Sequence, residues 1–79
     1  MPALAYVLIQ ASHGKIDDVS KRLLKYKEVT DIHHLYGEFD IIIKVEAANS
    51  AKLQDFVAKK LRPIKDIKTT QTLVSSDVF

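Results

Sequence analysis

The segment Tyr36–Val45, with the sequence YGEFDIIIKV, predicts a hairpin turn followed directly by a β-strand. Gly37 supplies backbone angles that other residues avoid, and Asp40 is of a type that commonly hydrogen-bonds its own backbone in turns. From Ile41 to Ala47 every second side chain is apolar, whereas the alternate positions hold Ile42 and two charged residues. This period of two is typical of a strand, so we expect a turn at residues 37–40 and a strand at Ile41–Ala47.

The rest of the chain predicts three more strands and two helices around this hairpin. We expect strands at Ala3–Ala11, Val29–Tyr36 and Ile67–Val74, and helices from about Lys15 to Tyr26 and from Asn49 or Ser50 to about Leu61. The helices are indicated by apolar residues spaced three and four apart. These are Ile16, Val19, Leu23 and Tyr26 in the first helix, and Leu53, Phe56, Val57 and Leu61 in the second.

The element order β-α-β-β-α-β predicts an α+β fold of the ferredoxin-like type. In that fold the four strands form one antiparallel sheet, and right-handed crossovers place both helices on the same face. Because a chain of 79 residues has room for one hydrophobic core, we expect a single domain spanning residues 1–79.

The sheet face opposite the helices is predicted to be unusually apolar. It is expected to carry either Leu4, Tyr6, Leu8 and Ile42 or the alternate residues of the same strands, and the first set is too apolar to face water. Exposed apolar patches of this kind mark interfaces, and a domain this small gains stability by oligomerising. We therefore predict a homodimer packed sheet to sheet, in the manner of a dimeric α/β barrel.

Composition and charge exclude several classes of protein. The chain has no cysteine, which excludes disulfides and thiolate metal sites, and its net charge is only +2. Although lysine and arginine cluster near the second helix, no aromatic residues are interleaved with them, so we interpret the cluster as a solvated face rather than a nucleic-acid interface. With no apolar run of the ~20 residues that a bilayer span needs and no basic segment before the first strand, we expect a cytoplasmic protein without a membrane partner.

Most catalytic motifs are missing. The two glycines cannot build a phosphate-binding loop, and among the serines only Ser12 has a histidine close by in the sequence. His33 and His34 invite a metal-site hypothesis, but neighbouring residues of a strand point to opposite faces and cannot share an ion. We expect neither a metal nor a cofactor.

Three segments resemble the effector-binding domain of the Lrp/AsnC (leucine-responsive, feast/famine) regulators, also called the RAM domain. Gly37-x-x-Asp40 followed by an aliphatic strand is similar to the signature hairpin of that domain. Leu53-x-x-Phe56-Val57 resembles its second helix, and Ile67-x-x-Thr70-x-Thr72-x-Val74 resembles its last strand. The three segments occur in the order of the predicted elements and together cover nearly the whole chain.

The resemblance implies a module that dimerises through its sheet, assembles into rings of dimers and binds a small amino-acid effector between dimers. The residues that the motifs carry over as the binding site are Tyr36, Gly37, Glu38, Phe39 and Asp40 in the hairpin, with Thr70 and Thr72 opposite. In such a site Asp40 would take the ligand's ammonium, and the Gly37 N–H and the threonine hydroxyls its carboxylate.

Regulators of this family carry a helix-turn-helix before the module, whereas here the first expected strand begins at Ala3. We therefore expect a stand-alone form that does not bind DNA directly and that acts by co-assembling with a full-length regulator. Two alternatives remain open at this point. One is a small cofactor-independent enzyme of the dimeric α/β-barrel type, with His33 or His34 and Asp31 as an acid–base pair, and the other is a purely structural assembly module.

Overall fold

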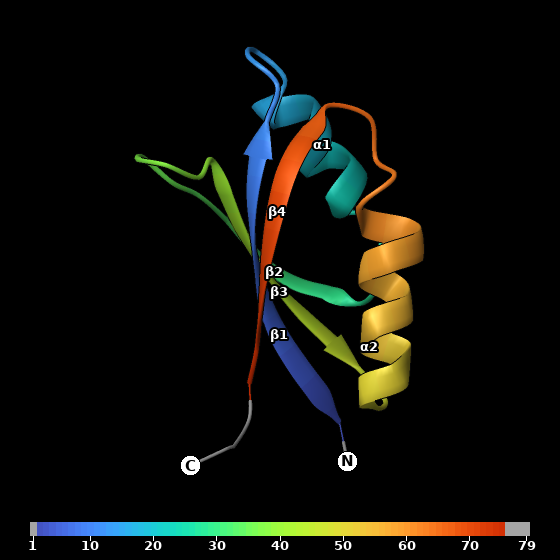
Figure 1. Cartoon of the computed structure of the whole chain (residues 1–79). Helices are drawn as coiled ribbons and strands as arrows, with labels where there is room; N and C mark the ends of the chain where they lie inside the picture. The colour runs from blue at the N-terminus through green and yellow to red at the C-terminus, as the bar shows by residue number, and fades with distance from the viewer. Residues whose placement is uncertain (1, 76–79) are drawn as a thin grey trace.

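The structure, a computed structural model, describes residues 2–75 (Figure 1). The elements follow one another in the predicted order. They are β1 (Ala3–Ala11), α1 (Ile16–Leu23), β2 (Val29–His34), β3 (Ile41–Ala47), α2 (Ser50–Phe56), the π-helical continuation η1 (Val57–Leu61) and β4 (Ile67–Val74). The bounds of β1, β3 and β4 are those that the sequence predicts.

Within residues 2–75 the strands form one four-stranded sheet in the order β2-β3-β1-β4, and every neighbouring pair is antiparallel. Both α1 and α2 cover the same face of this sheet, as Figure 1 shows. The predicted ferredoxin-like α+β class is therefore confirmed. The central strands β1 and β3 pair without a shift, from Ala3 opposite Ala47 to Ile9 opposite Ile41.

The hydrophobic core fills the space between the sheet and the two helices. Alternate residues of β1 and β3 point into it, and the predicted helix stripes meet them from the other side. Its fully buried large side chains are Val7, Ile9, Val19, Leu23, Ile41, Ile43, Val45, Leu53 and Leu61. The rings of Tyr26 and Phe56 meet edge to face with centroids 5.3 Å apart, a favourable aromatic geometry that packs the end of the first crossover against α2.

A bulge in β2 determines which of its side chains face the core. Val29 pairs with Val45, but the next paired residue, Asp31, lies opposite Lys44, so Thr30 is extra. The extra residue lets both Val29 and Ile32 pack against the core although three positions separate them. As a result, Asp31 lies on the face of the sheet away from the helices.

Three details of these elements differ from the prediction. β2 ends at His34, two residues before Tyr36, because the hairpin begins there. α1 ends at Leu23 because the N–H groups of Lys25 and Tyr26 donate to carbonyls only three residues back. The second helix reaches Leu61 as predicted, but from Val57 it is π-helical, and its N-cap is Asn49, whose side chain accepts from the N–H of Lys52 at 2.9 Å.

Candidate functional site

The hairpin between β2 and β3 projects from the sheet on the side away from the helices (Figure 1). Its base is closed by the N–H of Leu35, which donates to the carbonyl of Asp40 at 2.8 Å. At its tip, Tyr36 is fully exposed, and Gly37 has φ +124°, a region that residues with a Cβ rarely adopt. The predicted turn is thus a well-defined loop that presents an aromatic ring to its surroundings.

Asp40 anchors this hairpin to β1. Its N–H donates to the carbonyl of Ile9 at 2.9 Å, and its carboxylate oxygen Oδ2 accepts from the N–H of Ala11 at 2.9 Å. The side chain therefore takes the place of a backbone carbonyl and extends the β1–β3 ladder by one step. In the described part of the chain no hydrogen bond is made by Oδ1, which leaves one carboxylate oxygen for a ligand.

Gln10 links the hairpin to the opposite edge of the sheet. Its amide nitrogen donates to the carbonyl of Glu38 at 2.7 Å, and its amide oxygen accepts from the hydroxyl of Thr69 at 2.8 Å. Gln10 was not among the predicted site residues, because nothing in the neighbouring sequence indicates that it bridges segments 28 and 59 residues away.

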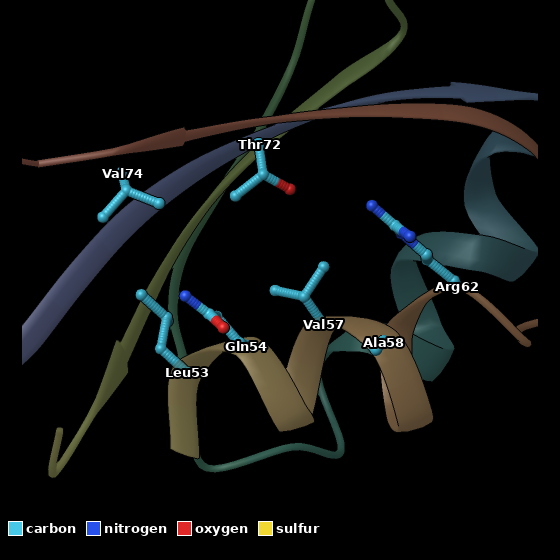
Figure 2. A pocket seen from close by; sticks show the side chains of 7 residues that line it. All are labelled: Leu53, Gln54, Val57, Ala58, Arg62, Thr72 and Val74. Carbon is cyan, nitrogen blue, oxygen red and sulfur yellow. The ribbon is translucent and has the colours of Figure 1, made fainter. Parts of the chain in front are cut away.

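The two predicted threonines lie on the helix-facing side of the edge strand β4, opposite Val7 and Ile9 of β1. Thr72 contributes to a cavity of about 350 Å³ between β4 and the second helix (Figure 2). We call this the β4–α2 cavity, and its lining residues are Leu53, Gln54, Val57, Ala58, Arg62, Thr72 and Val74. The hydroxyl oxygen of Thr72 is buried and has no hydrogen-bond partner.

Thr70 borders a smaller cavity of about 180 Å³, which it shares with Arg62 and Lys68. Arg62 therefore adjoins both predicted threonines, although it was not among the predicted site residues. Its position at the end of the second helix, just before Pro63, gave no indication that it lies over β4. Gln54 was also missed, because its position within α2 gives no sign in the sequence that it faces β4.

In a single chain the predicted binding residues form two separate groups. None of the five hairpin residues from Tyr36 to Asp40 lines the β4–α2 cavity or the cavity beside Thr70. The threonines face the helices, whereas the hairpin projects to the other side of the sheet (Figure 1). Within one chain the two groups therefore line different surfaces.

The four residues predicted for the dimer interface lie on the sheet face away from the helices. Leu4, Leu8 and Ile42 are partly exposed, and Tyr6 is 40% exposed. Leu73 of β4 lies directly opposite Tyr6 and is also exposed. This face, which we call the open face, thus carries apolar side chains from β3, β1 and β4, although Lys44 lies opposite Tyr6 and Gln71 opposite Leu8.

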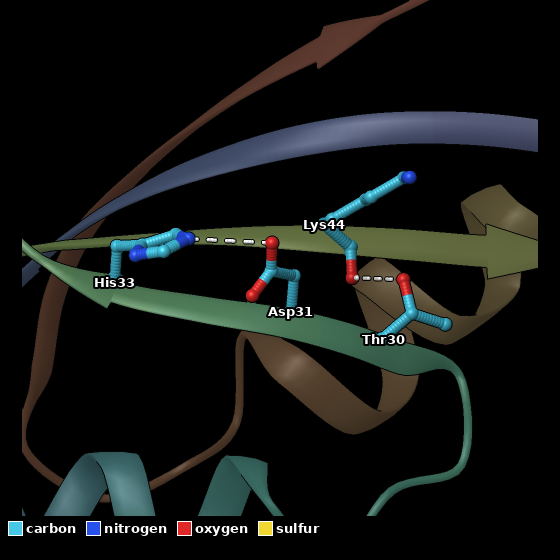
Figure 3. Close-up of polar contacts among 4 residues, drawn as sticks. All are labelled: Thr30, Asp31, His33 and Lys44. Atoms are coloured by element: carbon cyan, nitrogen blue, oxygen red, sulfur yellow. Dashed lines mark hydrogen bonds and ion pairs between the residues drawn. The ribbon is translucent and has the colours of Figure 1, made fainter.

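His33 and Asp31 lie on the same open face, at its β2 edge. The Nε2 of His33 is 3.3 Å from Oδ2 of Asp31, and Figure 3 shows the two side chains next to each other on β2. Both are exposed. His33 borders a hollow of about 60 Å³ on the open face and a larger one of about 450 Å³ between β2 and α1, which His34 also lines. Of the acid–base pair in the enzyme alternative, Asp31 therefore lies on the open face and does not line the larger hollow that His33 and His34 share.

His34 points to the opposite face from His33, as the strand geometry predicts. Its Nε2 is 2.8 Å from the hydroxyl of Ser20 on α1, a buried side chain. The pair of Ser20 and His34 was not predicted, because Ser12 is the only serine with a histidine close by in the sequence. Across residues 2–75 no group of three or more histidine and acidic side chains is arranged to hold a metal ion.

These features define a small ferredoxin-like module with an apolar sheet face and a cavity beside its edge strand. A model of the Lrp/AsnC ligand binding domain matches residues 4–79, and the chain belongs to this family. It is 30% identical over 71 residues to the HTH-type transcriptional regulator FL11 of Pyrococcus furiosus, covering 90% of this chain and 46% of that protein. The chain spans about half the length of the curated relatives that it matches.

Solved structures agree with this assignment. The crystal structure of FFRP-DM1 superposes with a TM-score of 0.90 at 33% identity, covering 92% of this chain and 97% of that one. E. coli AsnC gives a TM-score of 0.90 at 25% identity and covers 96% of this chain and 52% of that one. FL11 is named as a transcriptional regulator, and the matching family model describes a ligand binding domain. None of the helices in the described residues is both long and apolar enough to cross a membrane.

Proposed function

We propose that this protein is a cytoplasmic sensor module that binds a small amino acid between copies of itself and thereby modulates the transcription of genes of amino-acid metabolism. The observation that carries the proposal is the buried, unpartnered hydroxyl of Thr72 in the β4–α2 cavity of a family ligand-binding domain. A buried polar group without a partner is costly, so a ligand that supplies the missing hydrogen bond binds favourably there.

The proposed site is shared by two chains. One chain contributes Thr70 and Thr72, and the hairpin of a neighbouring copy contributes the segment from Tyr36 to Asp40. This arrangement accounts for the separation of the two groups within one chain. The free Oδ1 of Asp40 would accept from the ligand's ammonium, while the exposed ring of Tyr36 or the half-buried ring of Phe39 would contact its side chain.

Assembly is the proposed output of binding. We expect the open face, with Leu4, Tyr6, Leu8 and Ile42, to form the dimer, and hairpin contacts to join dimers into rings. A ligand that binds only the assembled form shifts the equilibrium toward that form by its differential affinity. The module would transmit this state by co-assembling with a full-length regulator and would not contact DNA itself.

Native mass spectrometry with and without a pool of amino acids tests the proposal. We expect species at even multiples of the 8.9 kDa monomer above two, with mass increments of one amino acid per interface. A dimer that the pool leaves unchanged would contradict an effector site between dimers. A pull-down from lysate that recovers no regulator with a helix-turn-helix would contradict the co-assembly step alone.

A further inference from the structure

We propose that Arg62 and Thr72 together bind the carboxylate of an aliphatic ligand in the β4–α2 cavity, an assignment that rests on the proposed function and specifies its ligand as an aliphatic α-amino acid. The guanidinium of Arg62 and the hydroxyl of Thr72 point toward one another across the cavity (Figure 2). No hydrogen bond joins them, and Thr72 Oγ1 is buried without a partner. A carboxylate placed between them accepts from both donors at once.

The charge of Arg62 is available for such a ligand. Elsewhere in the described residues lysines pair with acids, as Lys59 does with Asp55 at 3.8 Å and Lys15 with Asp18 at 3.7 Å, but Arg62 has no acidic partner there. The lining of the β4–α2 cavity likewise includes no aspartate or glutamate. Guanidinium groups suit carboxylates because they can donate two parallel hydrogen bonds.

The π-helical segment explains why Arg62 lies over β4. In an α-helix a residue five positions further on is rotated by about 140° around the axis, so Arg62 would point well away from Val57. Here the N–H of Arg62 donates to the carbonyl of Val57 at 3.0 Å, which closes a wider turn and stacks Arg62 above Val57. Single π turns of this kind occur frequently at functional sites.

The other residues that line the β4–α2 cavity determine which side chain the ligand can have. Leu53, Val57, Ala58 and Val74 provide an apolar wall, and Gln54 adds one amide. A volume of about 350 Å³ is at the lower end of the range for small-molecule sites, about 300–1,000 Å³. The cavity therefore suits a small ligand with an aliphatic side chain. Because the lining has no acid, the ligand's ammonium must point out of the cavity, where Asp40 of a second copy is proposed to bind it.

Isothermal titration calorimetry with three probe classes tests this assignment. The probes are aliphatic L-amino acids, the matching amino alcohols without a carboxylate, and isovalerate, which has a carboxylate and no amine. We expect the amino acids and, more weakly, isovalerate to bind, and the amino alcohols not to bind. The variants R62Q, R62K and T72V should weaken binding, R62Q by at least tenfold and R62K by less, whereas the exposed neighbour K60Q should not change it.

The outcomes separate the two proposals. If isovalerate binds in an Arg62-dependent way and no amino acid does, the carboxylate site stands and the amino-acid function fails. If amino acids bind equally to wild type and R62Q, or if the amino alcohols bind as well, the function stands and the assignment of Arg62 is overturned. Binding of none of the probes overturns both.

A carboxylate from the protein itself is the competing occupant. If Glu38 of a second copy fills the cavity, both E38Q and R62Q should dissociate the higher assemblies, and isovalerate should not bind to wild type. That pattern, read by native mass spectrometry beside the calorimetry, would overturn the small-ligand assignment. Thermal melts followed by circular dichroism confirm that each variant is folded.

Discussion

The carboxylate of Asp40 accepts a hydrogen bond from the backbone N–H of Ala11 at 2.9 Å, which makes a residue of the signature hairpin part of the β1–β3 ladder. The same side chain is the proposed partner of the ligand's ammonium. One oxygen therefore holds the hairpin in place while the other remains available for binding. Removing the Asp40 carboxylate should therefore weaken both the anchoring of the hairpin and the proposed binding of the ammonium. Different substitutions of Asp40 can separate these two effects.

Replacing Asp40 by alanine should reduce both stability and effector binding, whereas replacement by asparagine should reduce binding alone. The amide oxygen of asparagine still accepts from Ala11, but the charge that would hold the ammonium is lost. We expect D40A to lower the free energy of unfolding by about 1–2 kcal/mol and D40N to lower it by clearly less. Urea denaturation at fixed protein concentration measures the change in stability, and isothermal titration calorimetry measures the change in effector binding. Equal destabilisation by both variants would show that the hydrogen bond to Ala11 is not the origin of the loss.

The substitution Tyr6→Asp should dissociate the predicted dimer. It replaces an apolar ring by a carboxylate opposite Lys44, and desolvating this charged pair in a sheet-to-sheet interface costs more than the attraction between the two charges returns. We expect sedimentation analysis at micromolar concentration to change from a dimer to the 8.9 kDa monomer. Lys60→Asp, on the exposed surface of the second helix, is the matched control and should remain dimeric. If Tyr6→Asp is also dimeric, the chains associate through another surface.

Replacing Gly37 by alanine should destabilise the hairpin through backbone strain alone. A Cβ at Gly37 would meet no atom within 4 Å, but φ of +124° lies in a region that residues with a side chain rarely adopt. We expect a loss of roughly 1–3 kcal/mol. Gly14 is a suitable comparison because its surroundings are equally open, while its φ of +75° is close to the left-handed helical region. Chemical denaturation should therefore rank G37A as more destabilising than G14A, and the reverse order would contradict the strain argument.

Adjacent leucines provide a direct test of the core. Leu23 is fully buried, whereas Leu24 is 69% exposed. Truncation of a buried leucine to alanine leaves a cavity and costs about 2–5 kcal/mol, a large part of the stability of a small domain. We expect Leu23→Ala to unfold at much lower urea concentration or to be unfolded at 25 °C, and Leu24→Ala to stay within about 0.5 kcal/mol of wild type. If both variants lost similar amounts of stability, α1 would have to pack on the sheet in a different rotation about its own axis.

Local periodicity is the part of this protein that its sequence determined by itself. The apolar run in 3–11, the alternation in 41–47 and the three-and-four spacing in the helices predicted the element order, the fold class and most of the core. These patterns suffice because each strand or helix must turn one apolar face toward the same core. The hairpin from Tyr36 to Asp40 was also recognisable, since its glycine and aspartate are adjacent in sequence to the strand that they introduce.

Only the tertiary structure decided how the site residues are grouped. The contacts of Asp40 with Ala11 and of Ser20 with His34 join residues 29 and 14 positions apart, and neither partner carries a local sign of the other. The orientation of Arg62 toward Thr72 depends on one π turn, and the placement of Asp31 on the open face depends on the bulge at Thr30. Such features arise from packing, which selects small departures from regular geometry when they bury more apolar surface. The periodic pattern of the sequence does not predict where a bulge or a π turn will occur. The grouping of the candidate binding residues could therefore be determined only from the folded chain.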